Sequence, residues 1–385
     1  MPLQSLIDAL QARVPRILEL TRAWVEVNSY SKNTSGVNAC GVAIADAFRM
    51  DGLTLRVERG GPGSGDHLFW ATEAAAREPA ILLIGHHDTV FPPGHFEGYR
   101  VAEGRGYGPG CLDMKGGLAL VWGVVSTLAE AGRLRDLPLV ILSVGDEEVG
   151  SLDSERHTQA LAKAANCALV FEAGRPNDRI VTRRRGVGTV RARVSGRAAH
   201  SGNAHAEGAN AIWSLARFID AAQGHTRYTD GVTVNVGLVS GGTSFNTVPA
   251  QAEASIDLRF ESAASAHSLL ASLRESAERC AVPGTHIELE GGIKRLPMEK
   301  TPGSERLYQE YAVCQRAAGL SADEQPLVGG GSDGNTVAGV GLPVIDGLGP
   351  RGGGFHTLDE YVDLDSFAPK AEALLRFLCA RIGVS

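Results

Sequence analysis

Apolar and polar positions change their spacing twice along the chain. Three unbroken apolar runs, AILLIGHHD (80–88), PLVILSVGDEE (138–148) and CALVFEAG (167–174), are typical of strands buried on both faces of a sheet. A helical pattern, GGLALVWGVVSTLAEAG, lies between the first two runs and ends at Gly132. Strands that alternate with helices in this way predict a mostly parallel sheet with crossover helices.

A period of two residues begins near residue 185. In GTVRARVSG, Val190, Ala192 and Val194 alternate with polar residues, which predicts an antiparallel strand with one solvated face. A helix, two strands, a second helix and a last strand follow, which is the β-α-β-β-α-β order of a ferredoxin-like unit. The apolar α/β pattern then resumes at 342–349. We therefore expect an α/β protein in which an α+β domain, residues 184–292, is inserted into a larger domain formed by residues 1–183 and 293–385.

Composition and charge exclude several classes of protein. The net charge is −7 and no block of five or six like charges occurs, which disfavours a nucleic-acid or anionic-membrane partner. No apolar stretch approaches the roughly 18 residues of a membrane span, and the first 20 residues predict an amphipathic surface helix rather than a signal peptide. The six cysteines are scattered without a CxxC pair, which argues against a disulfide framework or a cysteine zinc site. We expect a cytoplasmic protein.

Acids and histidines follow each of the apolar runs. His86 to Asp88 follow the first run, Asp146 to Glu148 the second, and Glu172 the third. Ligands of open α/β sheets bind at the carboxyl ends of the strands, so these groups should converge in one crevice. Two further groups, Asp113 in GPGCLDMKGG (108–117) and His356 in GGGFH (352–356), lie in glycine-rich loops that we expect at the same place.

The chemistry of these groups points to metal ions. The candidate ligands are imidazoles and carboxylates without a thiolate, which suits Zn²⁺ or another first-row divalent ion: His86, Asp113, Glu148, Glu172 and His356. Three carboxylates balance two divalent ions and one hydroxide better than they balance a single ion, and paired metals suit hydrolysis. Asp88 is positioned to orient the ring of His86. Neighbouring side chains of a strand face opposite ways, so Glu147 should lie outside the ligand shell of Glu148 and act as a general base.

Five motifs in this order, HxD in GHHDTV, GPGCLDMKGG, DEE in VGDEEVGS, FE in LVFEAG and the late GFH, resemble those of the M20 co-catalytic zinc peptidases, nearest to the glutamate carboxypeptidase branch. The resemblance implies a zinc-peptidase-like α/β/α catalytic domain with two Zn²⁺ per subunit, bridged by Asp113 and a water or hydroxide. Glu148 and His356 would complete one site, and His86 and Glu172 the other. Glu147 would be the base, and the peptide bond after Asp113 would be cis.

The resemblance also implies partners and substrate contacts. The inserted domain would form a homodimer, in which His200 of GRAAHSG stabilises the oxyanion in the partner's active site. Arg259, Arg295 and Asn246 fall where the family holds the terminal carboxylate and the scissile carbonyl of the substrate. Arg179 stands where a lysine binds the glutamate side chain, but the arginines of VTRRRGVG (181–188) replace small hydroxylic residues and leave the glutamate preference open.

The expected function is release of a C-terminal glutamate or similar amino acid from small peptidyl or N-acyl substrates. Within the same chemistry, the alternative is an N-acyl-amino-acid deacylase or a dipeptidase. A distant alternative is a serine hydrolase, because Ser332 lies in a G-x-S-x-G motif and is followed by Asp346 and His356. A binding protein with a decayed metal site is a further class, disfavoured because every expected ligand and the base are present.

Overall fold

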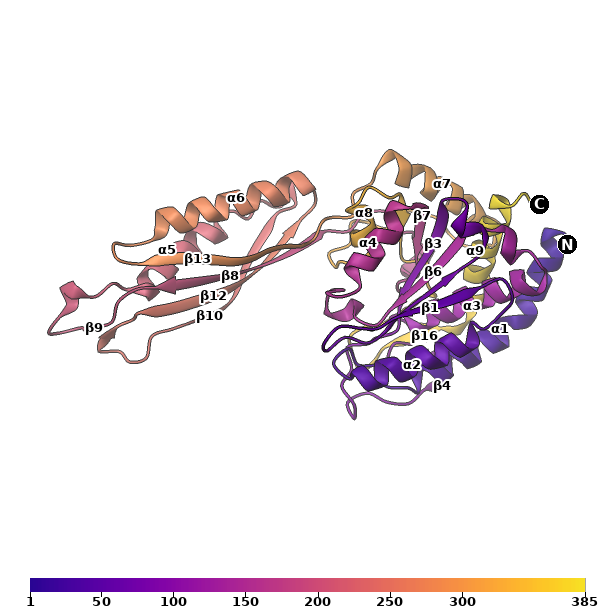
Figure 1. Cartoon of the computed structure of the whole chain (residues 1–385), viewed down its shortest axis with the longest axis horizontal. Coiled ribbons are helices and arrows are strands. Elements are labelled where there is room, and N and C mark those ends of the chain that lie inside the picture. The colour runs from indigo at the N-terminus through magenta and orange to yellow at the C-terminus, as the bar shows by residue number, and fades with distance from the viewer. Residues whose placement is uncertain (385) are drawn as a thin grey trace. The chain divides into compact units, whose positions relative to one another are not determined.

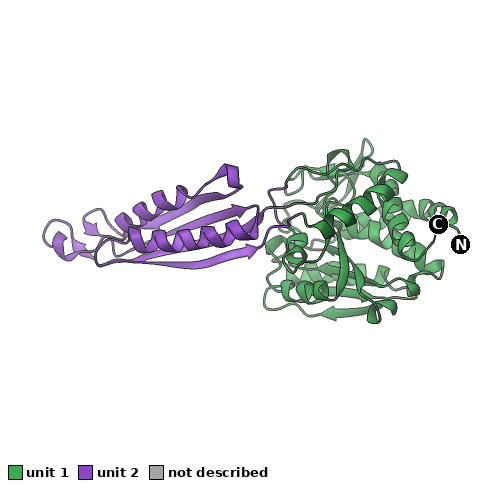
Figure 2. Ribbon diagram, turned by 90° about the horizontal axis from the view of Figure 1, so that it is seen from above, with its two compact units in different colours: residues 1–183, 300–327, 332–385 green, residues 184–299, 328–331 purple. Residues whose placement is uncertain are grey.

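The computed structural model describes residues 1–384 and divides the chain into two compact units (Figure 2). Unit 1 comprises Met1–Arg183, Lys300–Leu327 and the chain from Ser332 onward, and unit 2 comprises Arg184–Glu299 and Val328–Gly331. The boundary expected at 292/293 falls inside strand β13 (His286–Arg295), which pairs with strand β8 (Gly186–Ser195) as far as Arg295. The pairing of β13 therefore carries unit 2 several residues beyond the expected end.

Unit 1 is built on a six-stranded sheet with the strand order β1-β2-β6-β3-β7-β14. Its strands are β1 (Thr54–Glu58), β2 (His67–Ala71), β3 (Ala80–His86), β6 (Leu139–Val144), β7 (Ala165–Val170) and β14 (Val344–Ile345). The four strands β6, β3, β7 and β14 pair in parallel, as the apolar runs predict. The strands β1 and β2 form an antiparallel edge.

Helices cover this sheet within unit 1 (Figure 1). They are α1 (Leu3–Val25), α2 (Thr34–Ala47), α3 (Lys115–Glu130), α4 (Glu155–Lys163), α7 (Pro302–Ala317), α8 (Asp333–Ala338) and α9 (Phe367–Arg381). Every residue of β3 and β6 is buried, which explains why their sequences are apolar without alternation. A second, four-stranded sheet has the order β15-β16-β5-β4 and contains β4 (Arg100–Ala102), β5 (Arg105–Tyr107), β15 (Gly352–Gly353) and β16 (Tyr361–Asp363).

Unit 2 is a four-stranded antiparallel sheet with the order β10-β12-β8-β13. Besides β8 and β13, its elements are β9 (Ala199–His200), α5 (Ala211–Gln223), β10 (Thr233–Gly241), β11 (Thr247–Val248), β12 (Gln251–Phe260) and α6 (Ala263–Cys280). Both long helices lie on one face of the sheet (Figure 1). Val190, Ala192 and Val194 are buried there, so the alternation of the sequence correctly predicts which face is covered.

None of the helices among residues 1–384 is both long enough and apolar enough to cross a membrane.

Candidate metal centre

The adjacent parallel strands β6, β3 and β7 bring three ligand groups to one edge of the sheet. His86 is the last residue of β3 and pairs in register with Val144, the last residue of β6. Glu148 follows in the short 3₁₀ helix η3 (Glu147–Val149), and Glu172 lies two residues beyond the end of β7. Parallel register thus places side chains that are far apart in the sequence at the same end of the sheet.

Two groups of potential ligands share the carboxylate of Asp113. In the first, the Nε2 atom of His86 lies 3.3 Å from Oδ1 of Asp113 and 3.8 Å from Oε1 of Glu172. In the second, the Nε2 atom of His356 lies 3.4 Å from Oδ2 of Asp113 and 3.1 Å from Oε2 of Glu148. Within each group the ligand atoms all lie within 4.8 Å of one another. The five predicted ligands therefore come together, with one oxygen of Asp113 in each group.

The electrostatics of this cluster favour bound cations. Burial raises the pKa of Glu148 to about 8, and the neighbouring charge of Asp113 adds to the shift. Burial and the charge of Asp113 likewise raise the pKa of Glu172 well above its usual range. Hydrogen bonds to Asp113 and Glu148 raise the pKa of His356 to about 10. Buried carboxylates that repel one another at this distance are stabilised by positive charge, and their imidazole and oxygen donors fit first-row divalent ions.

Asp88 is fully buried and organises both sides of the cluster. Its Oδ1 atom lies 3.3 Å from Nδ1 of His86, a contact of the kind that orients the ring of a metal-ligating histidine. It also accepts hydrogen bonds from the backbone N–H groups of Glu147 and Glu148 and from the hydroxyl of Ser31, at 3.1, 3.1 and 2.7 Å. Asp88 therefore contacts both the ring of His86 and the turn of Glu147 and Glu148. The sequence pattern did not single out Ser31.

Glu147 and Glu148 do not lie in a strand, which corrects the geometric reason given for their separate roles. Strand β6 ends at Val144, and both glutamates belong to η3, where Asp88 accepts hydrogen bonds from their two N–H groups. The charge of Glu147 nonetheless contributes to the raised pKa of Glu148 and of Glu172, after burial and the charge of Asp113.

Two other features lie beside the ligands. The peptide bond between Asp113 and Met114 is cis, as the family resemblance implies. His87 is buried inside the protein, where its Nδ1 atom lies 2.9 Å from the hydroxyl of Ser143. Burial lowers the pKa of His87 to about 3, so this histidine is neutral.

The residues expected to act in trans or to bind substrate are placed mainly in unit 2. His200 and Asn246 lie close together there, because β9 pairs with β11 and the N–H of Ser201 donates to the carbonyl of Asn246. The Nδ1 atom of His200 accepts hydrogen bonds from the N–H groups of Gly202 and Asn203, so the proton of its neutral ring is on Nε2. This tautomer presents a hydrogen-bond donor at the exposed end of the ring.

The arginines differ in how they are held. The guanidinium of Arg259 makes two hydrogen bonds to Asp257 in the same strand, at 2.9 and 3.0 Å. Arg295, at the end of β13, is buried. Arg179 belongs to unit 1 and follows a 3₁₀ turn (Pro176–Asp178), and its Nε atom is buried without a hydrogen bond to the described residues.

The serine-hydrolase alternative is wrong. The hydroxyl of Ser332 donates to Asp346 at 2.6 Å and accepts from the N–H of Gly334, so this serine caps α8. His356 instead contacts Asp113 and Glu148. A nucleophilic serine needs a histidine to accept its proton, and the carboxylate of Asp346 occupies that place.

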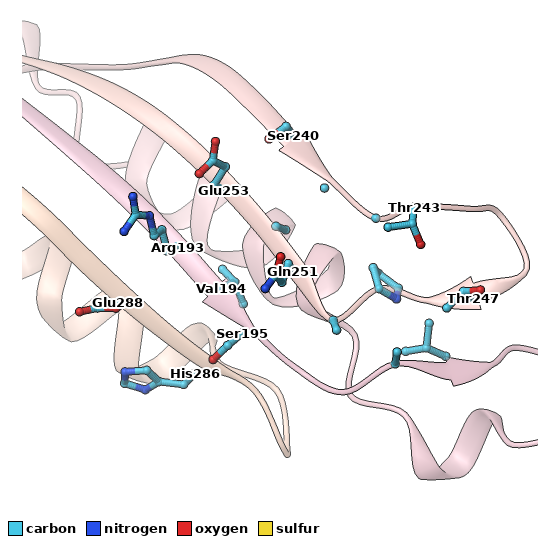
Figure 3. Close-up of a pocket in the computed structure, with 17 residues that line it drawn as sticks. Arg193, Val194, Ser195, Ser240, Thr243, Thr247, Gln251, Glu253, His286 and Glu288 are labelled. Atoms are coloured by element: carbon cyan, nitrogen blue, oxygen red, sulfur yellow. The ribbon is translucent and has the colours of Figure 1, made fainter.

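Unit 2 has a cavity of about 690 Å³ on its sheet (Figure 3). Charged side chains of both signs line it, including Arg193, Glu253 and Glu288. Among the described residues, however, both groups able to hold a metal belong to unit 1. The candidate metal ligands are therefore at the sheet edge of unit 1 rather than in this cavity.

Comparisons with known proteins agree with this geometry. The crystal structure of aminopeptidase PepT from Bacillus cereus shares the fold, with a TM-score of 0.77 and 21% identity over 95% of this chain and 98% of that one. Carboxypeptidase G2 of Pseudomonas sp. (strain RS-16) is 26% identical over 94% of this chain and 88% of its own length. A succinyl-diaminopimelate desuccinylase of Cereibacter sphaeroides is 30% identical over 84% of this chain and 88% of its own. The family model of peptidase family M20/M25/M40 matches residues 82–380, so the chain belongs to this family and is a hydrolase of peptide or amide bonds.

Proposed function

We propose that the protein is a di-zinc hydrolase that cleaves an amide bond beside a free carboxylate, most specifically a carboxypeptidase that releases C-terminal glutamate or a similar amino acid. The observation that supports the proposal is that Asp113 belongs to two groups of candidate ligands, a buried one with His86 and Glu172 and a more exposed one with Glu148 and His356. His86 and Glu172 would hold one ion with Asp113, and Glu148 and His356 the other. Other divalent metals fit the same donors.

Each step of the proposed reaction is assigned to a group of the protein or to the bound ions. Bound divalent ions would polarise the scissile carbonyl and lower the pKa of water. Glu147 accepts a proton from the attacking water while the water oxygen bonds to the carbonyl carbon. As the C–N bond breaks, Glu147 returns that proton to the leaving amine. The Nε2–H of His200, contributed by the neighbouring subunit, donates to the developing oxyanion.

The free carboxylate of the substrate would be bound by arginines. Arg259 is suited to this because Asp257 binds its Nε and Nη2 atoms and so holds the guanidinium, which leaves the N–H groups of Nη1 for a carboxylate. Arg295, Asn246 and Arg179 would complete the contacts to the substrate. The similarity to carboxypeptidase G2 supports a substrate with a free C-terminal carboxylate.

A second candidate, an N-acyl-amino-acid deacylase or dipeptidase, is favoured by the 30% identity to a succinyl-diaminopimelate desuccinylase. Both candidates cleave an amide next to a carboxylate, so a panel of N-acyl amino acids and dipeptides separates them. Preferential release of glutamate from peptidyl substrates supports the carboxypeptidase. Preferential hydrolysis of acylated amino acids supports the alternative.

A homodimer is part of the proposal. Unit 2 exposes large apolar side chains on α5 and on β10, which is an edge strand of its sheet: Ile212, Trp213, Leu238 and Val239. An exposed apolar edge of this kind is a site for pairing with another chain. We also propose a cytoplasmic location, because all six cysteines are free thiols.

The substitution Glu147→Gln tests the proposed function. It removes the base but no ligand, so kcat should fall by about 10²–10⁴-fold. The bound metal, measured by atomic emission, should stay at the wild-type level. Asp66→Asn is a control in the same unit. Wild-type activity that survives complete metal removal, or a Glu147→Gln variant with wild-type kcat, would contradict the proposal.

A further inference from the structure

Glu360 is a buried carboxylate that binds the loop of Asp113. Its side chain is inaccessible to solvent, and its two oxygens accept three backbone hydrogen bonds. The Oε1 atom accepts from the N–H groups of Leu112 and Asp113 at 2.9 and 3.0 Å, and Oε2 accepts from the N–H of Gly110 at 3.1 Å. One side chain thus fixes the backbone on which the shared ligand Asp113 is carried.

The same residue closes the loop that carries His356. The N–H of Glu360 donates to the carbonyl of Thr357, and the N–H of Thr357 donates to the carbonyl of Gly354. Directly after Glu360, β16 pairs with β5, with Tyr361 opposite Tyr107. Because β5 leads into the loop of Asp113, this pairing brings the two ligand loops together at Glu360.

A carboxylate is the side chain that this position requires. Three N–H donors converge on two oxygens, and each oxygen of a carboxylate accepts hydrogen bonds. A glutamine would have one acceptor oxygen and would turn an NH₂ group toward at least one backbone N–H. An aspartate would be one methylene too short to reach the same three donors.

We propose that Glu360 is a positioning residue of the metal centre, which joins the Asp113 loop to the His356 loop and sets the distance between these two ligands. The inference rests on the proposed function, in which both residues hold a metal. Residues that orient metal ligands without touching the metal typically contribute 10–100-fold to metal affinity or activity.

The test is the Glu360→Gln variant, with Asp66→Asn as its matched control. Asp66 also accepts a backbone hydrogen bond, from Gly60 at 3.1 Å, but lies in a loop that carries no ligand. Zinc affinity is measured by competition with a chromophoric chelator, and folding of the metal-free protein by circular dichroism. We expect Glu360→Gln to fold, to bind zinc about 10–100-fold more weakly and to lose kcat with little change in KM. Asp66→Asn should keep the wild-type affinity.

The outcomes separate this inference from the proposed function. A folded Glu360→Gln variant with wild-type zinc affinity and kcat would overturn the inference alone. Wild-type protein that binds no divalent ion would overturn the proposed function and the inference with it. If Glu360→Gln does not fold, Glu360→Asp and amide hydrogen exchange of the wild-type protein replace it. Slow exchange at residues 110–113 with weakened zinc binding in Glu360→Asp supports the inference. Fast exchange there, or wild-type zinc binding in Glu360→Asp, overturns it.

Discussion

The central sheets of the two units use charged residues in different ways. In unit 1, β3 and β6 are buried along their whole length, so charged side chains collect where the strands end. In unit 2, β8 alternates between buried and exposed residues, and its arginines pair across the open face, as Arg191 does with Glu253. A sheet covered on both faces concentrates charge into a centre that needs cations, whereas a sheet with one open face disperses charge into separate pairs.

The largest expected effect tests whether unit 2 takes part in the chemistry of a neighbouring subunit. Because His200 should donate to the oxyanion, His200→Ala should lower kcat by about 10²–10³-fold. Mixing this variant with Glu147→Gln should restore activity to about a quarter of the wild-type level, since half of the subunits then form mixed dimers with one intact site. Steady-state assays before and after subunit exchange measure this. A mixture that stays inactive would mean that both residues serve the same subunit.

Core substitutions test whether the two units are stabilised separately. Leu169 in β7 and Leu269 in α6 are both fully buried, so each change to alanine should cost about 2–5 kcal/mol of unfolding free energy. We expect Leu269→Ala to lower the temperature at which unit 2 unfolds, while the zinc affinity of the protein stays unchanged. Calorimetry and chelator competition give the two quantities. Zinc binding that weakens in proportion to stability would show that the centre depends on the core of unit 2.

The buried Lys370 in α9 gives unit 1 a pH-dependent stability. Burial lowers its pKa to about 8, although Asp178 lies 3.8 Å away. Between pH 8 and about 10.5 the unfolded chain holds this proton and the folded chain does not, so stability rises with pH in that window. Relative to Lys370→Met, the wild-type free energy of unfolding should increase by about 2–3 kcal/mol across it. Denaturant titrations at each pH measure the free energy of unfolding of both proteins. The same dependence of this free energy on pH in both proteins would contradict the prediction.

The smallest effect is expected on the open face of unit 2. Arg191 and Glu253 are both about half exposed, so Arg191→Ala should cost less than about 1 kcal/mol. The neighbouring residue Val190 is buried, and Val190→Ala should cost about 1–3 kcal/mol. Urea denaturation of the two variants measures both losses of unfolding free energy. A larger loss for Arg191→Ala than for Val190→Ala would mean that this face is covered in solution.

Much of the candidate site was predictable because short sequence motifs contain its residues. The apolar runs ended at the residues that begin the ligand motifs, and the period of two identified the covered face of unit 2. The roles of Ser31 and Glu360 had no such signal, since a lone serine or glutamate in a loop has the same local pattern whether it meets solvent or three buried N–H groups. The placement of Glu147 and Glu148 in a turn likewise depends on Asp88, which lies far away in the sequence.

The sequence by itself determined the two kinds of sheet, the ligand types and the family motifs, because these depend on residue spacing and on chemistry that each segment carries alone. Only the tertiary structure decided that Glu360 holds the loop of Asp113, the carboxylate that contacts both ligand groups as the family motifs imply. It also decided that Ser332 caps a helix rather than acting as a nucleophile. These properties arise from distances between segments far apart in the chain, which strand register and loop packing set and which no local pattern encodes.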